Sequence, residues 1–161
     1  MSRNYQSELL TITQDDRTNI FYFNVLKDEY NASQINIIKV YFTDLFEYFS
    51  TTTCLYGCIF NIEALSSYNL FNYTKDLKKF FQEHSRALNR YIAATAIIID
   101  STLIRMILAP FIQLVNKGRP LKFTRDETSA TDFIVTELNK DRNSLVALIT
   151  EPSISHLDHL D

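Results

Sequence analysis

The stretch AATAIIIDSTLIRMILAPFIQLVNKGRP, residues 93–120, is the least polar part of the chain and the feature that most limits its fold. A membrane-spanning helix needs about 20 largely uncharged residues, but Asp100 and Arg105 lie inside this stretch. Residues 92–99 are short and rich in β-branched side chains, which is typical of a strand buried on both faces. Asp100-Ser101-Thr102 then offers helix N-cap side chains. The stretch therefore predicts a buried strand followed by a helix, with no membrane span.

Strand and helix signals alternate in the same way along the rest of the chain. The polar turn QDDRT joins two apolar segments into an expected hairpin. The sequence Thr124-Arg125-Asp126-Glu127 has the pattern of a capping box, and residues 141–143 are expected to interrupt the helix that follows it. The expected order is ββαβαβαβα, with strands over 8–13, 19–26, 55–62, 92–99 and 121–124 and helices beginning near Asn31, Ser66, Ser101 and Thr124. Alternating elements of this kind favour parallel strands with right-handed crossovers, so the prediction is an α/β fold with a mixed sheet.

The apolar spacing also predicts which side chains form the core. Ala96 and Ile98 are expected in a central strand that is covered on both faces and ends at Asp100. The helix after that strand repeats apolar residues at helical spacing, with Leu103, Ile107, Phe111 and Leu114 on the face expected to pack inward and Ile104, Leu108 and Val115 widening the apolar stripe. The long helix from Ser66 onward shows a similar face that includes Leu70, Phe71, Phe80 and Phe81. The large core side chains expected on the helices are Phe42, Phe46, Phe80, Ile107 and Phe111.

Length, charge and cysteine content narrow the classes of protein that the chain can represent. At 161 residues it suits one domain over residues 1–150, with 151–161 as a flexible tail. A net charge of −3 gives no reason to expect nucleic-acid binding. No secretory signal is visible at the start, so we expect a cytoplasmic protein in which Cys54 and Cys58 are buried free thiols.

The order of these elements resembles the STAS domain, the fold of SpoIIAA-like anti-sigma-factor antagonists. The segments AATAIIIDSTLIRMIL and GRPLKFTRDETSATDFI are similar to the C-terminal half of small bacterial STAS/SEC14-like proteins. The resemblance covers roughly residues 8–138. It implies a SpoIIAA-like mixed sheet with an N-terminal hairpin.

The resemblance also implies a phosphorylation site. Antagonists of this family carry a phosphorylated serine in an Asp-Ser-Ser-Gly context at the helix start after the middle strand. The matching segment here is CIFNIEALSSYNLF, which makes Ser66 and Ser67 the candidate phosphate acceptors. Leu65 and Tyr68 replace the flanking Asp and Gly, so ordinary N-capping by these serines remains the alternative.

The expected topology predicts a second kind of site at the same edge. In a parallel sheet the strand-to-helix junctions open beside the carboxyl ends of the strands, and helix N-termini there attract anions. Asp100 would repel an anion, and Ser and Thr cap helices in most proteins, so simple capping is again the alternative. The candidate anion or ligand rim consists of Ser66, Ser67, Ser101, Thr102, Thr124 and Arg125.

No sequence pattern indicates catalysis. The chain contains no GxGxxG, P-loop or GxSxG motif, and we expect neither an enzyme nor a bound cofactor. His156 and His159 in the segment HLDHLD are too few for a rigid metal site, so no metal is expected. The prediction is a regulatory protein-interaction module with a protein partner and with a homodimer left open. The alternative, which the SEC14 side of the resemblance suggests, is a carrier of a small ligand or lipid in an apolar pocket.

Overall fold

The computed structural model describes the backbone of residues 4–115 and 118–150, and within these ranges the side chains up to residue 112 and from 118 to 143. The tail 151–161, with His156 and His159, therefore lies outside the described residues. The elements are β1 (Tyr5–Gln6), β2 (Leu10–Asp15), β3 (Ile20–Val25), α1 (Ala32–Ser50), β4 (Tyr56–Asn61), α2 (Ser67–Glu83), α3 (Ser85–Tyr91), β5 (Ile92–Ile98), α4 (Thr102–Val115), β6 (Leu121–Thr124) and α5 (Glu127–Thr150).

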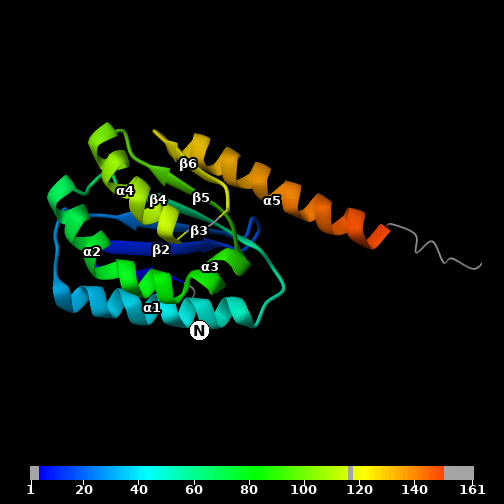
Figure 1. Ribbon diagram of the computed structural model, residues 1–161, viewed down its shortest axis with the longest axis horizontal. Helices are drawn as coiled ribbons and strands as arrows, with labels where there is room; N and C mark the ends of the chain where they lie inside the picture. The colour runs from blue at the N-terminus through cyan, green and yellow to red at the C-terminus, as the bar shows by residue number, and fades with distance from the viewer. Residues whose placement is uncertain (1–3, 116–117, 151–161) are drawn as a thin grey trace, which may run out of the picture.

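The strands form one mixed sheet in the order β1-β2-β3-β4-β5-β6 (Figure 1). The strands β1, β2 and β3 are antiparallel neighbours, whereas β3 to β6 run parallel. Each connection between the parallel strands leads to the adjacent strand in the sheet, and the chain always proceeds toward β6. Because such crossovers are right-handed, their helices all cover one face of the sheet, and α5 is left to cover the other. The predicted α/β fold with an N-terminal hairpin is confirmed.

The two faces of the sheet have different cores. On the crossover face, Phe21, Phe23 and Tyr56 pack with the aromatic side chains of α1. On the other face, Ala94 and Ala96 pack against α5, where small side chains let a helix approach the strands closely. The prediction for β5 is confirmed, since Ala96 and Ile98 are both buried in this strand, between β4 and β6.

The predicted inward face of α4 is rotated by about one residue. Its buried side chains are Ile104 and Leu108, whereas Ile107 and Phe111 are only partly buried and Leu103 is exposed. Among the other expected core residues, Phe42 and Phe46 of α1 are buried and Phe80 of α2 is partly buried. The apolar stripe on α4 is wide enough to allow more than one orientation, and packing against the sheet selects between them.

Several element boundaries also differ from the prediction. The short strand β1 was not expected, and the long helix after Ser66 divides at His84 into α2 and α3. Helix α5 is continuous through 141–143, where a break was predicted, and its C-terminal part runs past the strands (Figure 1). Its cap is Asp126, not Thr124: the Asp126 carboxylate accepts from the Ser129 backbone N–H (2.7 Å) and hydroxyl (2.9 Å).

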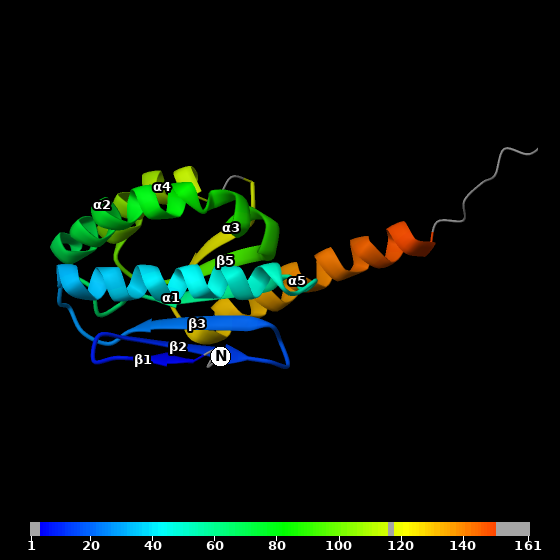
Figure 2. The ribbon, with the colours of Figure 1, turned by 90° about the horizontal axis from the view of Figure 1, so that it is seen from below.

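Helices α1, α2 and α4 pack on the crossover face, and in Figure 2 α1 runs along the strands with α2 and α4 together above it. The helices of the described chain are each too short or too polar to cross a bilayer.

Candidate functional site

The carboxyl edge of the parallel strands carries the predicted rim residues. Ser66 is the N-cap of α2, and its hydroxyl accepts from the backbone N–H of Asn69 at 3.2 Å. Ser66 and Ser67 are both partly buried. The serine that the family resemblance singles out thus caps its own helix, and whether either serine accepts phosphate stays a prediction.

Asp28 occupies the space in front of α2. Its carboxylate Oδ1 accepts from the Ser66 backbone N–H at 2.7 Å and from Asn69 Nδ2 at 3.0 Å. The Ser66 N–H, followed by the Asn69 side chain, lowers the pKa of Asp28 below its usual range. The α2 N-terminus therefore already holds an anionic group, supplied by the β3–α1 connection. Local sequence could not reveal this pairing, because 38 positions separate Asp28 from Ser66.

The remaining rim residues do not form one cationic pocket. Arg125 Nε lies 3.0 Å from the carboxylate of Asp100, so its charge is paired at the surface. Thr124 is buried, and its hydroxyl donates to the carbonyl of Asp126 at 3.2 Å. Ser101 accepts weakly from the backbone N–H of Ile104 at 3.4 Å. The rim therefore consists mainly of satisfied caps and one exposed ion pair.

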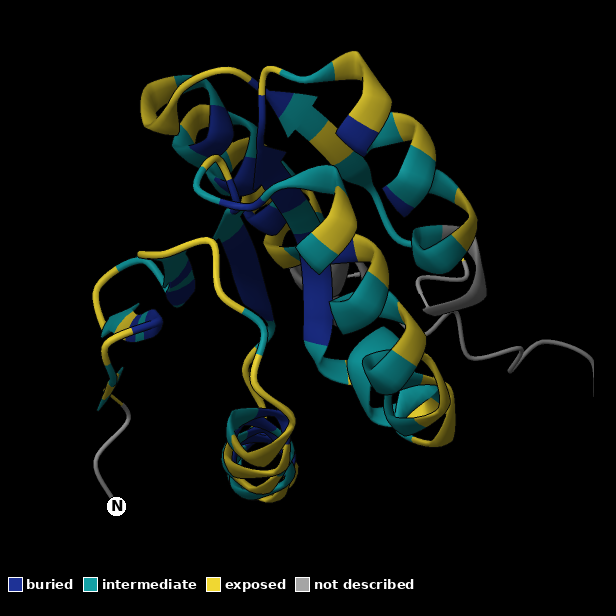
Figure 3. Cartoon of the chain, turned by 90° about the vertical axis from the view of Figure 1, so that its left-hand side faces the viewer, coloured by how far each residue is buried: buried dark blue, intermediate teal, exposed yellow. Residues whose placement is uncertain are grey.

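Large apolar side chains are exposed at this same edge. Tyr68 and Phe71 lie three residues apart near the start of α2, and Leu103 and Met106 lie three residues apart near the start of α4. Residues with this spacing share one face of a helix, and α2 and α4 pack against each other. The four side chains, which we call the edge patch, are 75%, 58%, 58% and 68% exposed, respectively. Figure 3 looks at this end of the molecule, where exposed segments (yellow) mark the outer faces of the helices.

The sequence analysis missed this patch because it assigned Phe71 and Leu103 to the core. Both belong to apolar stripes, and a stripe by itself does not show where burial ends. The signal that could have found them is the excess of apolar residues, because Leu70 and Ile104, their neighbours in sequence, already supply the buried positions.

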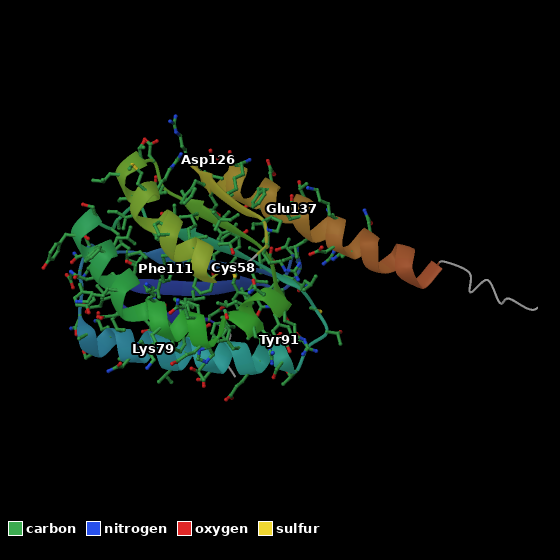
Figure 4. All side chains as sticks on the ribbon, in the orientation of Figure 1. Cys58, Lys79, Tyr91, Phe111, Asp126 and Glu137 are labelled. Atoms are coloured by element: carbon green, nitrogen blue, oxygen red, sulfur yellow. The ribbon has the colours of Figure 1, made fainter. Side chains whose placement is uncertain are left out.

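An apolar cavity of about 170 Å³ lies between the helices and the crossover face of the sheet. Its lining includes Cys58 of β4 and Phe111 of α4, which Figure 4 labels near the centre of the domain. Burial raises the pKa of the Cys58 thiol to about 12, so this group is neutral and inert. Both cysteines are free thiols, but Cys54, which was expected to be buried, is exposed. A second cavity of about 170 Å³ shares Phe42, Phe81 and other walls with the first and extends toward Leu65 and Tyr73.

Metal ligands are not gathered anywhere in the part of the chain that the structure describes: no three His, Cys, Asp or Glu side chains come together there. His84, the one histidine within this part, packs against Phe46 and Phe80. Its Nδ1 lies 2.8 Å from the carbonyl of Phe80. This histidine thus takes part in a helix end and in aromatic packing.

The strand order and the placement of the helices define a SpoIIAA-like α/β domain. No family model matches the sequence, and neither does any curated protein. A solved structure that the chain resembles is an uncharacterized protein of the DUF3478 family with a SpoIIAA-like fold, from Shewanella loihica PV-4. The TM-score is 0.52 at 14% sequence identity, and the match covers 81% of this chain and 98% of the other. The comparison shows the fold, which agrees with the resemblance to the STAS and SpoIIAA-like domains.

Proposed function

We propose that this domain is a non-enzymatic protein-interaction module that docks a partner on the edge patch. The observation that carries the proposal is the exposure of Tyr68, Phe71, Leu103 and Met106 on the first turns of two packed helices. Tyr, Phe and Met are enriched in the cores of protein interfaces. Large apolar side chains that are exposed as a group mark an interaction site more often than isolated ones do.

A second exposed apolar pair, Ile37 and Val40, lies on α1 and serves as the comparison. The edge patch is preferred because it has two aromatic members and draws on two helices. It also lies beside the carboxyl ends of the strands, where open α/β sheets bind their ligands. We propose that the partner presents a matching apolar cluster.

The neighbouring serines make the proposed interaction open to regulation. Phosphate on Ser66 or Ser67 would add about −1.5 to −2 charges directly before Tyr68. The carboxylate of Asp28 already bonds the α2 N-terminus, so a phosphate there would face a like charge and would loosen the β3–α1 connection. Phosphorylation is therefore proposed to weaken docking on the edge patch while leaving the core intact.

Affinity purification with paired variants tests the docking proposal. Phe71→Ser with Met106→Ser removes apolar surface from the edge patch, and Ile37→Ser with Val40→Ser removes a similar amount from α1. All four side chains are exposed, so both variants should fold. The proposal expects a partner that binds the wild type and the α1 variant but not the edge variant. Equal recovery by all three proteins would contradict it, and loss with the α1 variant alone would move the interface to α1.

A second candidate function is the binding of a small apolar molecule in the central cavity. The observation that favours it is a lining of 18 residues in which Thr95 is the only side chain bearing a hydroxyl. A cavity of about 150 Å³ is enough to bind benzene in another protein. The cavity of about 170 Å³ is smaller than the roughly 300 Å³ at which ordinary ligand sites begin. The candidate ligand is therefore a single aromatic ring or a short alkyl chain and not a full lipid.

Native mass spectrometry and a neutral naphthylamine probe test this second candidate. Leu108→Phe places a larger side chain in the cavity wall, and Leu103→Phe makes the same change on the surface of the same helix. Probe binding by the wild type and by the surface variant, but not by the cavity variant, supports an apolar ligand site. Absence of both a co-purifying small molecule and probe binding rejects it.

A further inference from the structure

A polar hollow of about 380 Å³ lies on the other face of the sheet, beside the start of α5. Helix α5 packs on β4, β5 and β6, so the hollow lies next to the helix over β2, β3 and the carboxyl end of β4. Its volume falls within the range of about 300–1,000 Å³ that is usual for small-molecule sites. The lining consists of Thr11, Thr13, Tyr22, Phe23, Asn24, Ile59, Asn61, Ile98 and Glu127.

A straight row of polar residues crosses the floor of this hollow. Thr11 pairs in register with Asn24, and Asn24 pairs in register with Asn61, which puts neighbouring positions about 4.8 Å apart. Asn is depleted in strands, and parallel strands inside a sheet usually read as continuous apolar runs. The fold accounts for Asn61, whose side chain bonds the turn after β4, but it does not account for Asn24 at the carboxyl end of β3.

The polar groups of this row have unused hydrogen-bonding capacity. Asn61 Oδ1 accepts from the backbone N–H of Glu63 at 3.2 Å, which leaves its amide NH₂ group without a protein partner among the described residues. Within the same part of the chain, the side chains of Thr11, Tyr22 and Asn24 form no hydrogen bond. Tyr22 and both Asn side chains are partly buried, so a ligand would meet a preformed array of donors and acceptors.

We infer that this hollow binds a neutral, hydroxyl-rich ligand of monosaccharide size. Amides and hydroxyls both donate and accept, as the hydroxyls of a sugar require. Glu127 is the only charged residue of the lining, and its carboxylate can accept from two neighbouring hydroxyls while disfavouring anions. The Tyr22 ring, which is only partly buried, supplies apolar surface for the C–H groups of a sugar ring. The inference is independent of the edge patch, which lies on α2 and α4.

Amide chemical-shift titration with the methyl glycosides of glucose, mannose and galactose tests this inference. The expected result is a saturable shift of the amides of residues 11, 24, 61 and 127 with at least one glycoside. Asn24→Ala with Asn61→Ala should weaken that binding about tenfold or more, because each tenfold corresponds to the loss of little more than one hydrogen bond. Asn36→Ala, an exposed change on α1, should leave the binding unchanged, and the amide spectra report whether every variant folds.

Three outcomes would overturn the inference. The first is that none of the three glycosides gives a saturable shift. The second is that the double Asn variant binds the glycoside as tightly as the wild type. The third is that inorganic phosphate shifts the same amides more strongly than the glycosides do, which would mean an anion site. Glu127→Gln keeps the side-chain shape and removes the charge, so it should reduce glycoside binding without abolishing it.

Discussion

Gly57 is the position at which α5 comes closest to the sheet, and it offers a sharp test of the packing. A Cβ atom added at Gly57 would overlap Ile134 Cγ2 of α5 and would lie 3.6 Å from Leu138 Cδ1. Ile134 is fully buried, so it has little room to move away. Overpacking of this kind costs about 1–3 kcal/mol. We therefore expect Gly57→Ala to lower the free energy of unfolding by that amount.

Gly57→Ala should no longer destabilise the protein when the Ile134 side chain is shortened. Ile134→Ala alone should cost roughly 2–5 kcal/mol through the cavity that it leaves. In that background the new methyl group at position 57 has space, and Ala is preferred to Gly inside a strand by about 0.5–1 kcal/mol. The double variant should therefore be as stable as Ile134→Ala or slightly more stable, which is a strongly non-additive result.

Urea unfolding of the four proteins, followed by circular dichroism, measures this cycle. If the four proteins share one m-value, the dependence of the free energy of unfolding on urea concentration, then differences in their midpoint urea concentrations measure differences in stability. If Gly57→Ala were neutral in the wild-type background, or if its cost were the same in both backgrounds, α5 would not pack on β4 as described.

Three further predictions concern single side chains. Ile104→Ala should cost roughly 2–5 kcal/mol in urea unfolding and Leu103→Ala less than about 1 kcal/mol, and a reversed ranking would show that α4 presents its other face to the sheet. The Asp28 carboxyl should titrate below 3.8 by carbon-13 NMR. Because the pKa of Asp28 is lower in the folded than in the unfolded state, its ionised carboxylate stabilises the fold at pH values above the unfolded-state pKa. This stabilisation is lost as the pH falls through the folded-state pKa. The free energy of unfolding of Asp28→Asn should therefore decrease less in acid than that of the wild type. Cys58, whose pKa burial raises to about 12, should resist a thiol reagent in a Cys54→Ser protein until the protein unfolds, and rapid native labelling would refute that burial.

The fold was accessible from sequence because its strongest signals are local. Residues 92–99 form a short, uniformly apolar run, and the cap residues after them mark where the helix begins, so both β5 and α4 were found. The strand β6 was found with the same bounds, Leu121–Thr124. The very short β1 was missed because two residues carry too little periodicity to detect.

The surfaces of the helices were harder to predict than their existence. Apolar residues occupy more than one face of α2 and α4, and the sheet decides which of them are buried. For this reason Phe71 and Leu103 were expected inside and are exposed. The contact between Asp28 and Ser66 and the row Thr11–Asn24–Asn61 depend on strand order and register, which no local pattern specifies.

The most direct test of the proposed interaction is site-specific photo-cross-linking in cells that express the protein. A benzophenone side chain is placed at Phe71 in the edge patch and, as a matched control, at Val40 on α1, which is also exposed. The account predicts a discrete covalent adduct with one partner from position 71 and none from position 40. No adduct from position 71, or the same adducts from both positions, would contradict docking on the edge patch.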